Sequence, residues 1–220
     1  MCWNKDISLN TFLFSVFALL FIYITNTYTR YKSPSFYNKW VYVVTLMVSS
    51  MQLLEYFIWK NIKNRDMNIF LSKIGLLLIF LQIGSFILLA DKAYRYLILF
   101  AFVVFSMAVY FYKSMYSPFV FKTTISKNGH LSWEWLRFPG IEKIILLAGL
   151  FFYLLPLLLM KQVNQSNVFL GTIFFIAAYL FLKKDNTYGS VWCWLVNLLL
   201  LKIVIDILII QPFYEYNGLC

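Results

Sequence analysis

The feature that most constrains the fold is a succession of long apolar segments separated by short polar ones. A helix of about 20 largely apolar residues crosses the roughly 30 Å of hydrocarbon in a bilayer. Such segments occupy residues 8–28, 37–59, 68–90, 94–112, 141–160, 167–182 and 190–210, the sixth being the shortest. The sequence therefore predicts an all-α membrane protein, a bundle of about seven transmembrane helices.

Little of the chain lies outside these segments, so we expect a single transmembrane domain over residues 1–220. Charged residues make up 13% of the chain, about half of the roughly 25% that is usual in soluble domains. The partner that this composition predicts is the lipid bilayer. Lys5 and Asp6 precede the first apolar segment and no small-residue cleavage site follows it, so we expect this segment to remain in the mature protein.

The net charge of +10 predicts an orientation in the membrane and not nucleic-acid binding, because the cations gather between the apolar segments. Cytoplasmic loops carry an excess of Lys and Arg. With seven spans, roughly twice as many cations lie on the side of the N-terminus, which we therefore expect in the cytoplasm, with the C-terminus outside. Cys2 and Cys193 then lie on the reducing side and Cys220 on the other, so no structural disulfide is expected.

Residues 113–140, between the fourth and fifth spans, form the only long loop. The pair Asn128-Gly129 lies there between two β-prone stretches, FVFKTTIS and HLSWEWL. Asn-Gly in this setting is typical of a hairpin turn, since both residues tolerate positive φ. We expect a small β-hairpin over the inner ends of the helices. The alternative is an irregular loop whose Trp133 and Trp135 rest among the lipid headgroups.

Two polar side chains lie inside the second span. A charged group at the centre of a span costs about 2.5–3.5 kcal/mol on insertion scales, so such a residue usually faces protein or a cavity. Gln52, Glu55 and Trp59 are spaced i, i+3 and i+7 and share one helix face. Glu55 lies about one turn from the inner surface, at a depth similar to that of Lys73. It could pair with Lys73, snorkel to the surface, or be held in a site as a proton carrier or ligand.

A second intramembrane group lies on the last span. Lys202 and Asp206 are four residues apart, so they can neutralise each other between packed helices. A lysine midway along a seventh helix is also where rhodopsins hold retinal, which makes Lys202 a candidate cofactor residue. Retinal is the least favoured interpretation, because the acidic residue follows the lysine and the third span has no acidic counter-ion.

The chain opens with MCWNKDIS, the second span carries QLLEYFIW and the last span opens with GSVWCW. Together these stretches resemble a family of small multi-pass membrane proteins of bacteria and large DNA viruses. Its bacterial members begin with Met-Cys-aromatic-Ser, carry Gln-x-x-Glu-x-x-x-Trp in the second span and have Ser-x-Trp-Cys late in the chain. The matching positions are Cys2, Trp3, Ser8, Gln52, Glu55, Trp59, Ser190, Trp192 and Cys193, and His130 is similar to a family histidine.

Asn4 and Trp194 depart from the bacterial pattern, and the Asn-, Lys-, Ile- and Phe-rich composition resembles the viral branch. The resemblance implies a membrane protein but no particular activity. With the expected topology, every matched motif falls on the inner side of the membrane. We therefore predict one polar site at the inner interface, covered by the hairpin.

The residue types at this site suit two kinds of chemistry. Cys2, Glu55, His130 and Cys193 are candidate catalytic residues, because a thiol nucleophile with His130 as base could act on a lipid or acyl substrate. The same two thiols, imidazole and carboxylate are ligand types that zinc takes, although no local spacing motif supports a zinc site.

Three functions stay open at this level. The first is transport of protons, ions or small solutes along a path from Glu55 on the inner side to Asn197, Lys202 and Asp206 further out. The second is an interfacial metal- or thiol-dependent enzyme that acts on lipid. The third is a membrane sensor or scaffold whose polar face holds a ligand or a partner.

Overall fold

The computed structural model describes residues 4–116, 118–160 and 165–217. These residues form a helical bundle with a small antiparallel sheet. The helices are α1 (Lys5–Tyr28), α2 (Lys39–Lys60), α3 (Arg65–Ile87), α4 (Lys92–Tyr116), α5 (Glu142–Leu158), α6 (Gln165–Leu182) and α7 (Tyr188–Ile205). Helix α7 continues through a π-helical turn (Asp206–Ile210) into α8 (Gln211–Tyr216).

The helical class predicted from the apolar segments is confirmed, since each predicted span coincides with a helix. Within the described residues, five helices are long and apolar enough to cross a membrane: α1, α2, α3, α4 and the continuous helix Tyr188–Tyr216. Helix α5 has 17 residues and is about 26 Å long at 1.5 Å per residue. That seven helices cross the membrane stays a prediction.

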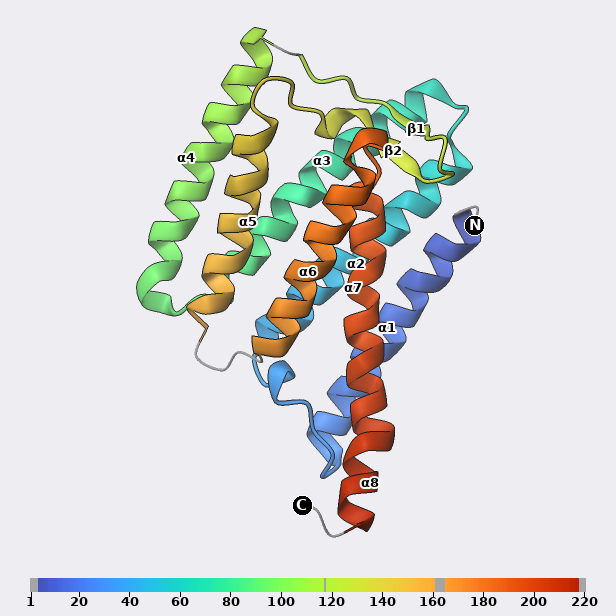
Figure 1. The fold of residues 1–220 in the computed structure, drawn as a ribbon, viewed down its shortest axis with the longest axis vertical. Coiled ribbons are helices and arrows are strands. Elements are labelled where there is room, and N and C mark those ends of the chain that lie inside the picture. Colours follow the sequence, from blue (N-terminus) through green and yellow to red (C-terminus); the bar gives the residue numbers. More distant parts are fainter. Residues whose placement is uncertain (1–3, 117, 161–164, 218–220) are drawn as a thin grey trace.

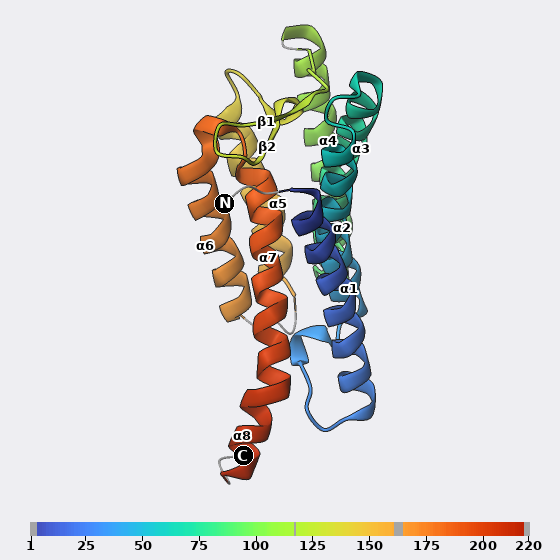
Figure 2. The ribbon, with the colours of Figure 1, turned by 90° about the vertical axis from the view of Figure 1, so that its right-hand side faces the viewer.

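The helices lie side by side and run up and down the long axis of the molecule (Figures 1 and 2). One end, which we call the hairpin end, carries the β-hairpin and the turns that join α2 to α3 and α6 to α7. Helix α1 begins toward this end, and α8 lies at the opposite end. The start of α1 and the end of α8 therefore lie at different levels along the bundle.

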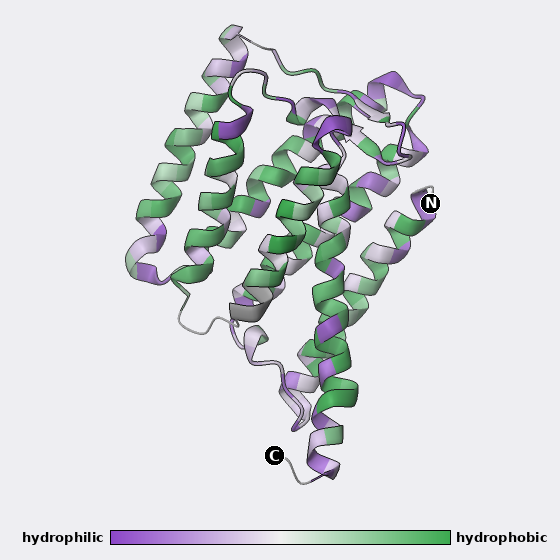
Figure 3. Ribbon diagram, viewed as in Figure 1, coloured by the Kyte–Doolittle hydropathy of each residue, from purple (hydrophilic) through white to green (hydrophobic). Residues whose placement is uncertain are grey.

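The outside of the bundle is apolar along the helices, and hydrophilic residues gather at the two ends (Figure 3). Phe17 and Phe100, both in the middle of helices, are each 68% exposed. A protein surrounded by water rarely exposes large contiguous apolar surfaces. The long apolar helices and their apolar outer faces fit a protein embedded in a membrane.

Asparagine side chains cap the N-termini of three helices. Asn4 Oδ1 accepts hydrogen bonds from the backbone N–H groups of Asp6 and Ile7 at the start of α1. Asn38 and Asn64 cap α2 and α3 in the same way. These caps satisfy N–H groups that have no partner inside the helix, so the polar segments between the apolar runs define where the helices start.

The predicted hairpin is confirmed. Strand β1 (Thr123–Ile125) pairs with β2 (Leu131–Trp133) in antiparallel register, with Thr123 opposite Trp133. Gly129 in the turn has φ 80°, the positive value that the Asn-Gly pair predicts. The hairpin lies over one end of the bundle (Figure 1).

Candidate functional site

The hairpin inserts two tryptophans between the ends of the helices. The rings of Trp133 and Trp135 stack with centroids 5.1 Å apart and are 1% and 0% exposed. The alternative of an irregular loop with both indoles among lipid headgroups is therefore wrong. The tryptophans instead belong to a buried apolar cluster that also contains Met51, Leu54, Ile58, Leu71, Leu131 and Cys193.

Two glycines make room for these rings. A Cβ atom on Gly75 of α3 would lie 2.7 Å from Cζ2 of Trp135. A Cβ atom on Gly189 of α7 would lie 2.5 Å from Cζ3 of Trp133. Because real Cβ atoms do not approach other heavy atoms so closely, a larger residue at either position would push the hairpin away from the bundle.

Helix α3 holds strand β1 through one asparagine. Asn68 Nδ2 donates to the backbone oxygen of Thr123 over 3.0 Å, and Asn68 Oδ1 accepts from the backbone N–H of Thr123 over 2.9 Å. The hydroxyl of Thr123 accepts from Trp135 Nε1 at 3.1 Å and lies 2.9 Å from the hydroxyl of Ser72. The buried polar groups of β1 are thus satisfied by α3, as burial requires.

A second asparagine holds strand β2. Asn186, in the turn before α7, has a left-handed backbone with φ 54°. Its side chain donates to the backbone oxygen of Trp133, and its own backbone oxygen accepts from the N–H of Trp133. Asn128 in the hairpin turn donates to Thr187 Oγ1 at 3.0 Å. These bonds attach the hairpin to the start of α7.

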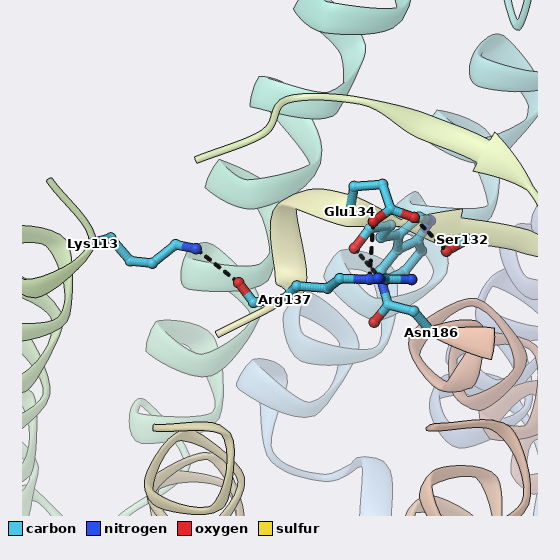
Figure 4. A network of polar contacts seen from close by, with 6 residues as sticks. Lys113, Ser132, Glu134, Arg137 and Asn186 are labelled. Atoms are coloured by element: carbon cyan, nitrogen blue, oxygen red, sulfur yellow. Dashed lines mark hydrogen bonds and ion pairs between the residues drawn. The ribbon is translucent and has the colours of Figure 1, made fainter. Parts of the chain in front are cut away.

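A polar network continues along the loop after β2 (Figure 4). Glu134 accepts from the hydroxyl of Ser132 at 3.1 Å and pairs with Arg137 at 2.9 Å. Lys113, near the end of α4, donates to the backbone oxygen of Arg137 at 2.8 Å. The hairpin and its loop therefore connect α4 to α7 across the hairpin end.

Glu55 lies beneath this cover, inside the bundle. Its side chain and that of Gln52 are each 2% exposed, and Gln52 Nε2 donates to Glu55 Oε2 at 3.2 Å. The alternative of an ion pair with Lys73 is wrong, since Glu55 forms no ion pair with any described residue. Lys73 is exposed, with Nζ 5.7 Å from the ring centroid of Phe121. The snorkelling alternative for Glu55 is also wrong, because its carboxyl group is buried.

Helix α7 presents a hydroxyl and a thiol to this carboxyl group. Ser190 faces the Glu55 carboxyl group, and Cys193 is close enough to interact with it electrostatically. The approach of Ser190 falls short of a hydrogen bond of normal geometry, since Ser190 Oγ and Glu55 Oε1 are both buried without one among the described residues. Cys193 is fully buried.

The polar contacts continue one turn further along α7. Asn197 Nδ2 donates to the backbone oxygen of Cys193 at 3.1 Å, and Asn197 Oδ1 accepts from the hydroxyl of Ser15 in α1. Both side chains are buried. Helices α1, α2 and α7 therefore enclose a set of buried polar side chains that we call the polar row: Ser15, Gln52, Glu55, Ser190, Cys193 and Asn197.

The candidate His130 lies in the hairpin and not in the polar row. His130 is half-buried at the end of the hairpin turn, where partial burial lowers the pKa of its imidazole. Among the described residues, no three His, Cys, Asp or Glu side chains are grouped so that they could hold a metal ion. Cys2 lies outside the described residues, so the zinc site and the thiol enzyme, which both include it, stay predictions.

The last span carries two further candidates, Lys202 and Asp206. Lys202 is exposed on α7, a position that gives the retinal interpretation no support, since retinal requires an enclosed pocket. Asp206 accepts a hydrogen bond from Gln211 Nε2 at 2.8 Å, and Gln211 also bonds the backbone of Lys32. Asp206 thus belongs to the end of the molecule opposite the hairpin.

Comparison of the chain with protein-family models, curated proteins and solved structures found no match. The family resemblance of the three motifs therefore stays a prediction. The structure does bring two of these motifs together, since Gln52 and Glu55 of the second span face Ser190 and Cys193 of the last.

Sequence reasoning missed three residues of this region: Ser15, Asn68 and Asn186. A hydroxyl in the middle of an apolar segment is a weak signal for Ser15, because serine is common in membrane helices. Asn186 follows Lys183, Lys184 and Asp185 between two apolar segments, which is typical of a turn. Nothing local indicates that its partner is Trp133.

Proposed function

We propose that this chain is a seven-span integral membrane protein with its N-terminus in the cytoplasm, and that Glu55 binds and releases a proton during transport of protons, ions or small solutes. The observation that carries this proposal is the position of Glu55. Its carboxyl group is buried between α2 and α7 and pairs with no cation among the described residues. Ionisable groups inside membrane bundles commonly mark proton relays and ion pathways.

The chemistry of the setting favours a proton as the bound species. A carboxylate that loses its water without gaining a cation is strongly destabilised, whereas a neutral carboxylic acid needs far less solvation. Gln52 already donates to Glu55 Oε2, and the rotatable hydroxyl of Ser190 can either donate or accept. These neighbours can therefore serve both protonation states.

The polar row indicates the path along which this proton would move. From Ser190 to Asn197 it extends seven residues along α7, about 10 Å at 1.5 Å per residue, away from the hairpin end. Ser15 adds a hydroxyl from α1 at the Asn197 level. In the present conformation these side chains are packed together, so a pathway would open only when α7 moves relative to α1 and α2.

The last helix has a feature that suits such a movement. The π-helical turn Asp206–Ile210 interrupts it between α7 and α8. Single π-turns inside helices occur frequently at functional sites and at kinks. We propose that α7 moves about this turn while α8 keeps its contacts with the α1–α2 loop.

The test is proton flux into liposomes that contain the purified chain and a trapped pH-sensitive dye. We expect flux above that of empty liposomes, and a loss of at least about tenfold in Glu55→Gln, because an amide cannot bind the proton. Glu55→Asp should retain part of the flux, since it keeps the carboxyl group.

Asp66→Asn is the matched control, because Asp66 is an exposed carboxylate in the first turn of α3. It should leave the flux unchanged. The proposal fails if Glu55→Gln conducts like the unmodified protein, or if the unmodified protein conducts no better than empty liposomes under proton and cation gradients.

A further inference from the structure

A cavity of about 590 Å³ lies on the side of the bundle away from α1. Helices α3, α4 and α5 line it on one side, and α6 and α7 on the other. Helix α5 packs against α3 and α4, whereas α6 packs against α7. The cavity is therefore the space left where these two groups of helices diverge, and its size is within the range of about 300–1,000 Å³ that small-ligand pockets have.

The deep part of the cavity is aromatic. Its walls include Phe80, Phe102, Phe105, Phe152 and Trp192. Along α5, the lining runs from Glu142 to Tyr153, eleven residues further on or about 16 Å. The cavity is thus an elongated apolar space that starts at the hairpin end and reaches toward the middle of the bundle.

The mouth of the cavity is basic. It is lined by Lys143 in the first turn of α5 and by Lys183 and Lys184 in the turn that follows α6, and all three are exposed. Lys183 Nζ lies 5.5 Å from the ring centroid of Tyr179, which also lines the cavity.

One carboxylate, Glu142, is also part of the mouth. The guanidinium of Arg137, which lines the cavity as well, already pairs with Glu134. Three lysines therefore face one acidic residue around the opening, and the opening carries a net positive charge.

We propose that this cavity binds an anionic phospholipid, with an acyl chain among the aromatic side chains and the headgroup at Lys143, Lys183 and Lys184. A neutral lipid would bring no net negative charge to the three lysines. A free phosphate would leave the apolar space unfilled. Basic pockets between membrane helices on the cytoplasmic side bind anionic headgroups in other proteins. The site goes beyond proton binding at Glu55 and does not rest on it.

Gly149 offers a way to fill the cavity. It lines the cavity, and a Cβ atom there would meet no other heavy atom within 4 Å. Gly149→Phe would therefore place a ring in the space proposed for the acyl chain. Gly84 in α3 is the matched control, because its Cβ would also meet nothing within 4 Å and it does not line the cavity.

The headgroup contacts are tested by replacing Lys143, Lys183 and Lys184 together with glutamine. The control replaces Lys60, Lys63 and Lys127, which are exposed residues of the same end of the molecule that do not line the cavity. Both triple variants remove the same charge. A difference between them therefore reports the cavity and not the overall field of the protein.

The experiment titrates the full chain in mild detergent with dioleoyl phosphatidylglycerol, dioleoyl phosphatidylcholine or inorganic phosphate, and counts the bound molecules by native mass spectrometry. We expect the anionic lipid to bind about tenfold or more tightly than the neutral one. The lysine variant should lose this preference. Gly149→Phe should weaken binding of both lipids, and both controls should behave as the unmodified protein.

Equal binding of the two lipids to the unmodified protein would overturn the proposal, as would equal losses in the lysine variant and its control. Phosphate that binds as tightly as the anionic lipid would also overturn it, because the acyl chain would then contribute nothing. If Gly149→Phe fails to fold, the lysine variant alone decides. Failure of this test would leave the flux test of Glu55→Gln unaffected.

Discussion

The two sides of the bundle pack their helices in different ways. Where α1, α2 and α7 meet, buried polar side chains such as Ser15 and Asn197 lie among aliphatic ones such as Ile22. Where α3, α4 and α5 meet, aromatic rings join the aliphatic residues of the core, and Phe102 and Phe152 pack edge to face with centroids 5.3 Å apart. The first side borders a small cavity of about 140 Å³, whereas the second borders one of about 590 Å³.

The difference follows from the size of the side chains. Small residues let helix backbones approach closely in a membrane, and interhelical hydrogen bonds then form between the few polar groups. Large rings hold the helices further apart, which fits the larger cavity on this side. The side with the buried polar groups suits the movement of a proton, and the side with the larger cavity suits a ligand.

The largest effect should come from removing a hydrogen-bonding residue on the polar side. Asn197→Leu keeps the branched outline of the side chain but loses the bonds to Ser15 and to the backbone of Cys193. We expect the free energy of unfolding in detergent micelles to fall by about 2 kcal/mol.

Phe102→Leu is the matching change on the aromatic side. We expect it to lower the free energy of unfolding by less than about 1.5 kcal/mol. Chemical denaturation of both variants in the same detergent would measure the two losses. If Asn197→Leu costs no more than Phe102→Leu, then hydrogen bonds do not distinguish the two sides.

A smaller effect of opposite sign is expected at the cavity. Gly149→Ala should raise the free energy of unfolding by about 0.5–1 kcal/mol, because the added methyl group meets open space and alanine favours the helix. Gly75→Ala should lower it, since the same methyl group would press on Trp135. Thermal unfolding followed by circular dichroism would measure both changes. A loss in Gly149→Ala would mean that no space exists there.

The smallest effect concerns the hairpin, which covers both sides. Partial burial lowers the pKa of His130 below its usual value near 6.5, so the unfolded chain binds more protons below that pH. The stability contributed by neutral His130 is then present above about pH 6.5 and is lost as the pH falls through the lower pKa of the folded state.

Thermal unfolding between pH 7.5 and pH 5 would test this, with His130→Gln as the comparison, since glutamine does not titrate. We expect a smaller decrease in melting temperature over this range in His130→Gln than in the unmodified protein. Equal decreases would assign the pH dependence to other groups.

The helices and the hairpin could be predicted because their signals are local. An apolar run of about 20 residues predicts a helix whatever surrounds it, and seven such runs became seven helices. Asn128-Gly129 predicted the turn because glycine readily adopts the positive φ that Gly129 has there. The polar character of Gln52 and Glu55 was equally visible, since both interrupt an apolar segment.

The partners of these residues depended on which helix faces meet, and no local pattern carries that information. Lys73 lies at a depth similar to that of Glu55, yet it points outward, and the neighbours of Glu55 are Ser190 and Cys193 of α7. Tryptophan is common at membrane interfaces, so Trp133 and Trp135 could be expected there. They are buried instead, because Gly75 and Gly189 leave room for their rings.

Composition and spacing alone were therefore sufficient for the helical class of the chain, for a helix in each apolar run and for the hairpin between α4 and α5. The tertiary structure decided that Glu55 is buried without a cation among the described residues, that Ser15 bonds Asn197 and that a basic cavity opens between α5 and α6. The physical reason is that hydrophobicity and turn geometry act within a few residues of the chain. Packing joins residues as far apart as Ser15 and Asn197, which only the folded bundle brings into contact.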